Sequence, residues 1–231
     1  MMSIWTDLWE LFFPRCCLLC GSPLEHGEKV LCFSCLAGLP RTGFHLLEDN
    51  RVECNFFGKF PIERATSFLY YTKGGDVRQL LYELKYHGHK EVGEVMGRTL
   101  AAELLSSHFF EGIDLIIPVP LHRRKKRQRG YNQSECLAGG ISAVTGIPIY
   151  ADIIARGRYT ETQTHKGQYE RWENVQNLFV CSSPELLENK HILLVDDVLT
   201  TGATIVSCAD ALQDIPGLRI SVLTLALAGE S

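Results

Sequence analysis

The 231-residue sequence lacks the features that mark membrane-spanning and exported proteins. No apolar run approaches the roughly 18–20 residues that a helix needs to cross a bilayer. The opening residues, MMSIWTDLWELFFPRCC, include Asp7 and Glu10 and no positively charged segment, so they do not resemble a signal peptide. We therefore expect no transmembrane segment and a cytoplasmic protein.

Positive charge is not in excess either, because the formal net charge is -4. Any basic function must come from local clustering of lysine and arginine. The hydrophobic content of 45% and the charged content of 22% are typical of soluble globular proteins.

Between residues 4 and 12, apolar side chains recur at helical spacing, which predicts a helix docked on the same protein. A membrane surface or a partner is the alternative for this stripe.

Cysteine is abundant, with nine residues in the chain. In CLLCGSPLEHGEKVLCFSC, a Cys17-x-x-Cys20 pair is followed by a Cys32-x-x-Cys35 pair. Four thiolates at this spacing suit tetrahedral zinc, and four protein ligands leave no open position for catalysis. We therefore expect a structural zinc finger. The alternatives are reduced cysteine pairs or a redox motif, with Cys16 as a possible substitute for Cys17.

The pattern changes near residue 60, which predicts two domains: a helix and zinc finger in residues 1–60, and a larger domain in residues 61–231. In the second domain, apolar segments that predict strands alternate with segments that predict helices. The predicted strands are RATSFLYYT, IDLIIPVP, HILLVDDV and RISVLTLALA. The predicted helices are GDVRQLLYELKYHG, EVGEVMGRTLAAELLSSHF, NQSECLAGGISAVTG and TGATIVSCADALQDI. This alternation predicts an α/β fold with a parallel sheet flanked by helices. Ligands of such sheets bind beyond the carboxyl ends of strands, here after Pro120 and after Val195.

The strand end after Val195 carries an unusual mixture of side chains in ILLVDDVLTTGAT. Two carboxylates, Asp196 and Asp197, suit a sugar diol or a magnesium ion. A glycine turn that opens a helix offers backbone N–H groups to a phosphate, and the neighbouring hydroxyls add donors. The residues of this turn are Thr200, Thr201, Gly202, Ala203 and Thr204. A phosphate beside a diol describes a ribose 5-phosphate, whereas a helix cap with surface aspartates is the plain alternative.

The other strand end is followed by a basic run, PVPLHRRKKRQRGYNQS. Its cations are Arg123, Arg124, Lys125, Lys126, Arg127 and Arg129. Such a run can be a solvated loop or a nucleic-acid patch. Because the strand should end near the phosphate turn, we expect one to three of these cations to bind pyrophosphate through forked hydrogen bonds.

ILLVDDVLTTGAT closely resembles the motif with which type I phosphoribosyltransferases bind phosphoribosyl pyrophosphate (PRPP). The resemblance implies that Asp196 and Asp197 hold the ribose hydroxyls, and that residues 200–204 hold the 5-phosphate. It implies magnesium as the ion that accompanies PRPP. Some members with this motif bind PRPP or nucleotides only to sense them, so the motif is more specific for the fold than for catalysis.

The order of the motifs resembles the ComF family, whose members are linked to DNA uptake in natural competence. The four-cysteine finger, LKYHG, PVPLHRRKKRQRGYNQ, TQTHKGQYERWENV and VDDVLTTGAT follow in the expected sequence. The resemblance implies that the fourth of these motifs closes over PRPP, with Gln163, Lys166, Arg171 and Asn174 as candidate contacts. Lys85 and His87 in LKYHG are further candidates. Many relatives carry another CxxC near Cys54, which is single here.

Two functions of different classes remain open on this basis. One is an enzyme that transfers phosphoribosyl from PRPP to an unknown acceptor, with Asp196 and Asp197 at the reaction centre, and that supports DNA uptake with the competence machinery. The other is a competence factor that binds single-stranded DNA through the finger and the basic run, with PRPP or a nucleotide as a regulatory ligand. Phe33, Phe44, Phe56 and Phe57 are candidates for base stacking in the second case.

Overall fold

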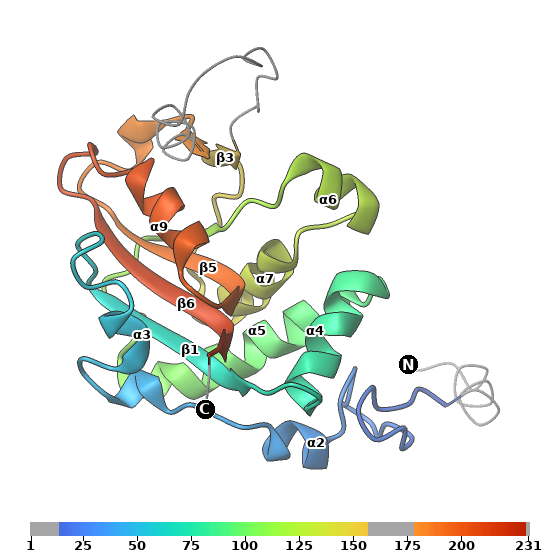
Figure 1. Cartoon of the computed structure of the whole chain (residues 1–231). Coiled ribbons are helices and arrows are strands. Elements are labelled where there is room, and N and C mark those ends of the chain that lie inside the picture. The colour runs from blue at the N-terminus through green and yellow to red at the C-terminus, as the bar shows by residue number, and fades with distance from the viewer. Residues whose placement is uncertain (1–13, 157–177, 230–231) are drawn as a thin grey trace.

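The computed structural model describes residues 14–156 and 178–229, and its centre is a four-stranded parallel sheet (Figure 1). Its strands are β1 (Arg64–Tyr71), β2 (Leu115–Pro118), β5 (His191–Leu199) and β6 (Arg219–Ala228), in the spatial order β1-β6-β5-β2. Every neighbouring pair in this order is parallel. The short strands β3 (Ile154–Arg156) and β4 (Phe179–Cys181) form a separate antiparallel pair.

The helices differ widely in length. The longer ones are α4 (Asp76–Tyr86), α5 (Lys90–Leu104), α7 (Gln133–Thr145) and α9 (Ala203–Asp210), and the shorter ones are α2 (Phe33–Gly38), α3 (Arg51–Cys54) and α6 (Arg123–Arg129). Single 3-10 turns lie at Phe44–Leu46, Leu105–Ser107 and Pro184–Leu186. Within the described ranges, no helix is both long enough and apolar enough to cross a membrane.

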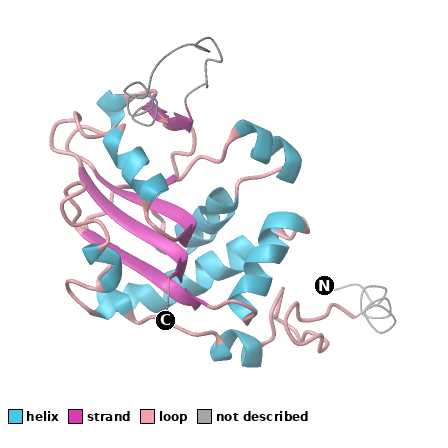
Figure 2. Cartoon of the chain, in the orientation of Figure 1, coloured by secondary structure: helices cyan, strands magenta, loops and turns pink. Residues whose placement is uncertain are grey.

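Both faces of the sheet are covered: α4, α5 and α7 lie on one face, and α9 and α3 lie on the other (Figures 1 and 2). Because successive side chains of a strand point to opposite faces, each strand feeds two separate cores. Ile116 and Leu193 belong to the core under α4, α5 and α7, whereas Ile117 and Leu194 belong to the core under α3 and α9. Burial on both faces explains the nearly continuous apolar runs of the strands and confirms the predicted fold class.

Glycines allow α5 and α7 to pack in close contact. A Cβ atom added to Gly97 of α5 would lie 2.2 Å from the carbonyl oxygen of Leu137, and one added to Gly140 of α7 would lie 2.3 Å from that of Glu94. Both distances are shorter than atoms tolerate, so only glycine fits at these positions. The close contact fixes α7, whose first residues reach the candidate site.

The N-terminal residues pack on the sheet domain. The backbone N–H of Thr42 donates to Phe68 of β1 at 3.0 Å, and the side chain of Asn50 donates to the Ala65 carbonyl at 2.9 Å. The side chains of Val52 and Phe56 are fully buried in the core under α9. The domain boundary near residue 60 stays a prediction, and the described residues on its two sides share packed cores.

One element agrees closely with the sequence-based expectation and one differs from it. β5 ends at Leu199, one residue after the predicted strand HILLVDDV, so the carboxylates of Asp196 and Asp197 lie within the strand. The basic run, expected as a loop, forms helix α6, because the side chain of His122 accepts from Arg124 N–H and Gly130 ends the helix with φ 83°. The predicted helix in residues 4–12 and the segment with Gln163, Lys166, Arg171 and Asn174 lie outside the described residues.

The glycine contact predicts a large loss of stability in Gly97→Val, because the added side chain collides with the backbone of α7. We expect a fall of about 2 kcal/mol or more in the free energy of unfolding, measured by urea denaturation. Gly139→Ala is the matched control, since a Cβ at Gly139 meets nothing within 4 Å. It should leave stability unchanged or raise it by up to ~1 kcal/mol. Equal stability of the two variants would refute the close contact.

Candidate ligand-binding cleft and metal centre

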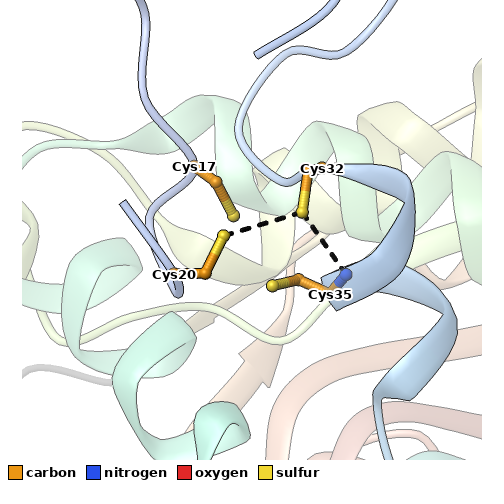
Figure 3. A group of neighbouring side chains, drawn as sticks. All are labelled: Cys17, Cys20, Cys32 and Cys35. Carbon is orange, nitrogen blue, oxygen red and sulfur yellow. Dashed lines mark hydrogen bonds between the residues drawn. The ribbon is translucent and has the colours of Figure 1, made fainter. Parts of the chain in front are cut away.

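Cys17, Cys20, Cys32 and Cys35 form one cluster, in which all four Sγ atoms lie within 4.8 Å of one another. In Figure 3 the four side chains converge on a common centre, with Cys32 and Cys35 at the start of α2 and the other pair on the facing turn. The cluster that the sequence predicts is therefore assembled. Across the described part of the chain, no histidine or carboxylate joins it, and neither Cys16 nor Cys54 is a member.

The cluster fits zinc. A tetrahedral site with Zn–S bonds of about 2.3 Å places its sulfur atoms about 3.8 Å apart. The Sγ atoms of Cys20 and Cys32 are 3.7 Å apart. Hydrogen bonds from Ser22 lower the pKa of the Cys20 thiol to about 6, whereas hydrogen bonds with Cys32 and Cys20 raise the pKa of the Cys35 thiol. Four sulfur ligands with no open position are compatible with a structural zinc.

In the sheet domain, Asp196 and Asp197 are held by two neighbouring side chains and by a hydrogen bond between them. The Oδ1 atom of Asp196 accepts from the Ser134 hydroxyl at 2.9 Å and from the Asp197 backbone N–H at 2.8 Å. The ammonium of Lys85, at the end of α4, lies 2.9 Å from Oδ2 of Asp197. The two carboxylates are thus fixed from both sides, by the start of α7 and by the end of α4.

The carboxyl group of Asp196 is easier to protonate than an ordinary aspartate. Burial, followed by the negative charge of Asp197, raises the pKa of Asp196 to about 7. The hydrogen bonds from Asp197 and Ser134 and the charge of Lys85 act in the opposite direction. Keeping Asp196 ionised at neutral pH therefore costs free energy, which a hydroxyl-bearing ligand can offset by donating to it.

The turn after β5 approaches the N-terminal region closely. Gly202 has φ 78°, and a Cβ atom at this position would lie 2.9 Å from the Phe56 ring and 3.0 Å from the Asn55 amide. Helix α9 begins at Ala203, directly after this glycine. Thr200, Thr201 and Ala203 are exposed, and Thr204 is partly exposed, so their groups are accessible to a ligand.

A cleft of about 820 Å³ contains the two aspartates together with Thr200 and Thr204. Five cations line it: Arg78, Lys85, Lys125, Arg129 and Arg156. Against two carboxylates, these cations leave a positive excess that attracts anions. Two buried donors of the lining, Gln133 Nε2 and Arg156 Nε, have no hydrogen-bond partner among the described residues. A ligand rich in acceptor oxygens would satisfy both.

The cleft contains only part of the basic run. Of the predicted pyrophosphate residues, Arg129 lines it, whereas Arg123, Arg124, Lys126 and Arg127 do not. Lys126 instead bonds Glu135 at 2.8 Å. Lys125 lines the cleft as well, so the structure brings two members of the run to the aspartates.

Sequence reasoning missed several cleft residues. Ser134 and Gln133 begin α7 directly after the basic run, and their place next to a strand end was a usable signal. Arg156 lies on β3, and nothing in its local sequence indicates that it reaches the cleft. Lys85 was a candidate from the family resemblance, and its bond to Asp197 places it in the cleft. His87 does not line the cleft.

Comparisons with known proteins agree with this geometry. Residues 132–231 match the family model of the phosphoribosyl transferase domain. The DNA utilization protein YhgH of Shigella flexneri is 30% identical over 219 residues, which cover 87% of this chain and 92% of the relative. Competence protein F of Haemophilus influenzae is 29% identical over 153 residues, a match that covers 64% of this chain and 67% of the relative. The chain belongs to the ComF family.

A third ComF relative is competence protein ComFC of Bacillus subtilis. It is 24% identical over 217 residues, which cover 82% of this chain and 85% of the relative. The matched domain of residues 132–231 contains both aspartates and the threonine-glycine turn.

The cysteine cluster predicts one zinc ion per chain. Metal analysis of freshly purified protein should give about one equivalent, and Cys32→Ser should lose most of it, because three remaining thiolates bind zinc more weakly. Cys16→Ser is the matched control, since Cys16 is exposed and lies outside the cluster. Unchanged zinc content in Cys32→Ser, or zinc loss in Cys16→Ser, would contradict the assignment.

The raised pKa of Asp196 predicts that Asp196→Asn stabilises the ligand-free protein at alkaline pH. The folded protein binds this proton more tightly than the unfolded chain, so wild type loses stability as pH rises from about 4 to about 7. Asparagine carries no charge and removes this loss. The advantage of the variant in the free energy of unfolding should be roughly 1 kcal/mol larger at pH 8 than at pH 6. A difference that does not change with pH would show that Asp196 titrates normally.

Proposed function

We propose that the cleft binds PRPP with magnesium, and that this ComF protein transfers the phosphoribosyl group to an acceptor. The observation that carries the proposal is the pair of carboxylates on β5, followed directly by the threonine-glycine turn, inside a cleft with excess positive charge. The match to a phosphoribosyl transferase domain supports it. The names of the relatives support a place in DNA utilisation and competence.

In this proposal each part of the strand end binds one part of the ligand. Asp196 and Asp197 accept hydrogen bonds from the two ribose hydroxyls. The hydroxyls of Thr200, Thr201 and Thr204 and the backbone of Gly202 and Ala203 bind the 5-phosphate, helped by the N-terminal end of the α9 dipole. Lys85 neutralises Asp197 while the cleft is empty, and in this proposal its ammonium turns toward a phosphate when the diol arrives.

The pyrophosphate is assigned to three of the four remaining cations. Arg129 and Lys125 come from α6, and Arg156 comes from β3. Guanidinium groups bind phosphate oxygens in pairs, and the unpartnered Nε of Arg156 is suited to such a contact. Magnesium, which keeps its waters and prefers phosphate oxygens, would enter with the pyrophosphate and offset its charge.

The chemistry assigned to the protein is positioning and charge stabilisation. When pyrophosphate leaves the ribose, positive charge develops on the sugar carbon, and nearby carboxylates stabilise it. Asp196 and Asp197 are the described carboxylates of the cleft. The arginines stabilise the negative charge of the leaving pyrophosphate. The remaining rate enhancement comes from holding donor and acceptor in one cleft, because the two molecules then lose their translational and rotational freedom on binding and not in the chemical step.

A second function, binding of single-stranded DNA, is favoured by the part of the basic run that lies outside the cleft. Arg123, Arg124 and Arg127 are exposed and form no ion pair with another described residue. Such cations attract a phosphate backbone in a salt-dependent way. Among the aromatic candidates near the finger, Phe33 and Phe57 are exposed, whereas Phe56 is buried and was a wrong choice for base stacking.

The PRPP proposal predicts that Asp196→Asn/Asp197→Asn loses PRPP affinity. The amide oxygens of asparagine still accept, but a hydrogen bond to a charged group contributes roughly 1.5–3 kcal/mol and one to a neutral group about 1 kcal/mol, so losing both charges should weaken binding by about tenfold or more. Isothermal calorimetry with magnesium and PRPP measures this loss. The control is Asp210→Asn, on α9 but outside the cleft, which should bind as wild type does.

Release of pyrophosphate from PRPP, assayed over a panel of bases, amines and single-stranded DNA, then separates an enzyme from a binding protein. Equal PRPP affinity of wild type and the double variant would contradict the proposed function. Binding without pyrophosphate release for any acceptor would favour a regulatory role of PRPP.

A further inference from the structure

The turn that follows β5 rests on residues from the N-terminal part of the chain. Gly202, at its centre, is buried, whereas its neighbours Thr201 and Ala203 are exposed. A Cβ atom at Gly202 would lie 2.9 Å from Cε1 of the Phe56 ring and 3.0 Å from Nδ2 of Asn55. The turn therefore has one face against the protein and one face open to a ligand.

The Phe56 side chain fills the space behind the turn. It is fully buried and belongs to the same core as Leu199, the last residue of β5, and Ile205, in the first turn of α9. The centroid of the Phe60 ring lies 5.3 Å from that of the Phe56 ring and supports it from the other side of the contact. One ring thus packs against the middle of the turn and belongs to the core that holds both of its ends.

Helix α3 fixes the position of Phe56 relative to the sheet. Asn50 caps this helix, and the Glu53 carboxylate accepts in return from the Asn50 backbone N–H. The same two side chains bind one residue of β1: Asn50 donates to the Ala65 carbonyl at 2.9 Å, and Glu53 accepts from the Ala65 N–H at 3.1 Å. The N–H of Phe56 donates to the Glu53 carbonyl at 2.8 Å, so the ring is held by a helix that is itself attached to the sheet.

Local hydrogen bonds give the turn little support of its own. Gly202 occupies the cap position of α9, and a glycine offers no side-chain acceptor to the first N–H groups of a helix. The Ala203 N–H donates to Thr201 Oγ1 at 3.4 Å, which is long for a hydrogen bond. The N–H groups left without a strong partner are those that a phosphate can accept from. Packing against Phe56 and Asn55 is therefore the main restraint on their direction.

We propose that Asn55 and Phe56 are positioning residues for the phosphate turn, which we define as residues 200–204. They pack behind Gly202 and restrict the turn to the conformation in which its N–H groups and threonine hydroxyls point into the cleft. This inference rests on the proposed function, because the turn is the part of the cleft assigned to the 5-phosphate. It extends the functional unit to a segment outside residues 132–231, the range of the family match.

The expected size of the effect follows from the population of the binding conformation. The apparent dissociation constant rises by the reciprocal of the fraction of molecules in that conformation. If a weaker support leaves the turn in it about a tenth of the time, affinity for the 5-phosphate falls about tenfold. Affinity for pyrophosphate should not change, because that group is assigned to Lys125, Arg129 and Arg156.

The test compares two variants with wild type. Phe56→Leu removes the ring that meets Gly202 and keeps an apolar side chain, and Asn55→Ala removes the amide. Asn55 is only partly buried, so Asn55→Ala carries the test if Phe56→Leu does not fold. Phe68→Leu is the matched control, because Phe68 is 2% exposed and belongs to the core on the opposite face of the sheet.

Two measurements are made at a temperature at which circular dichroism shows every protein folded. Calorimetry with ribose 5-phosphate and, separately, with magnesium pyrophosphate gives the affinity of each half of the cleft. Amide hydrogen exchange of the peptide that contains residues 200–204, followed by mass spectrometry without ligand, reports the turn itself.

We expect Phe56→Leu to bind ribose 5-phosphate about tenfold more weakly than wild type, with unchanged affinity for pyrophosphate and faster exchange in the turn. Asn55→Ala should change in the same direction, and Phe68→Leu should match wild type in all three measurements. Wild-type affinity and wild-type exchange in both Phe56→Leu and Asn55→Ala would overturn the positioning role. Equal weakening of ribose 5-phosphate and pyrophosphate would overturn it as well, because the effect would then not be confined to the turn.

This proposal and the proposed function fail separately. Wild-type protein that binds pyrophosphate but not ribose 5-phosphate would contradict the assignment of the 5-phosphate, and exchange in the turn would still decide the positioning role. Ribose 5-phosphate binding that neither variant weakens would contradict the positioning role alone.

Discussion

The packing of two adjacent carboxylates at the end of a buried strand is the constraint on which the rest of the site depends. Negative charges so close together raise each other's energy, and the burial of Asp196 adds to the cost. The fold offsets part of this cost with Ser134 from α7 and Lys85 from α4. Both helices must therefore be placed accurately, and the glycine contact between α5 and α7 provides that placement on one side.

This arrangement links stability to ligand binding. An ionised Asp196 is destabilising while the cleft is empty, and in the proposed function a ribose diol relieves it by donating a hydrogen bond. Residues that serve ligand binding often lower the stability of the ligand-free protein. Removing a charge at this site is therefore expected to stabilise the empty protein. The excess of cations around the aspartates has a similar effect. The cations repel one another in the empty cleft, and an anionic ligand relieves this repulsion.

The parts of the structure that were predictable from the sequence are those with a local physical signature. The apolar runs of the strands and the CxxC pairs each combine residue type with short spacing, and both are assembled as expected. The ligand role of the DDVLTTGAT segment stays a prediction. Helix α6 was not predictable because a run of cations has no apolar period, and its ends are set by His122 and Gly130. Arg156 and the Lys85–Asp197 pair depend on contacts between segments far apart in the sequence, which no local pattern reveals.

The identity of the bound ligand is the central claim, and a crystal structure of the protein with magnesium and PRPP tests it most directly. The account predicts both ribose hydroxyls within hydrogen-bond distance of Asp196 and Asp197, the 5-phosphate on residues 200–204, and the pyrophosphate among Lys125, Arg129 and Arg156. A PRPP molecule bound to the outer face of α6, with the aspartates still paired to Ser134 and Lys85 alone, would contradict it.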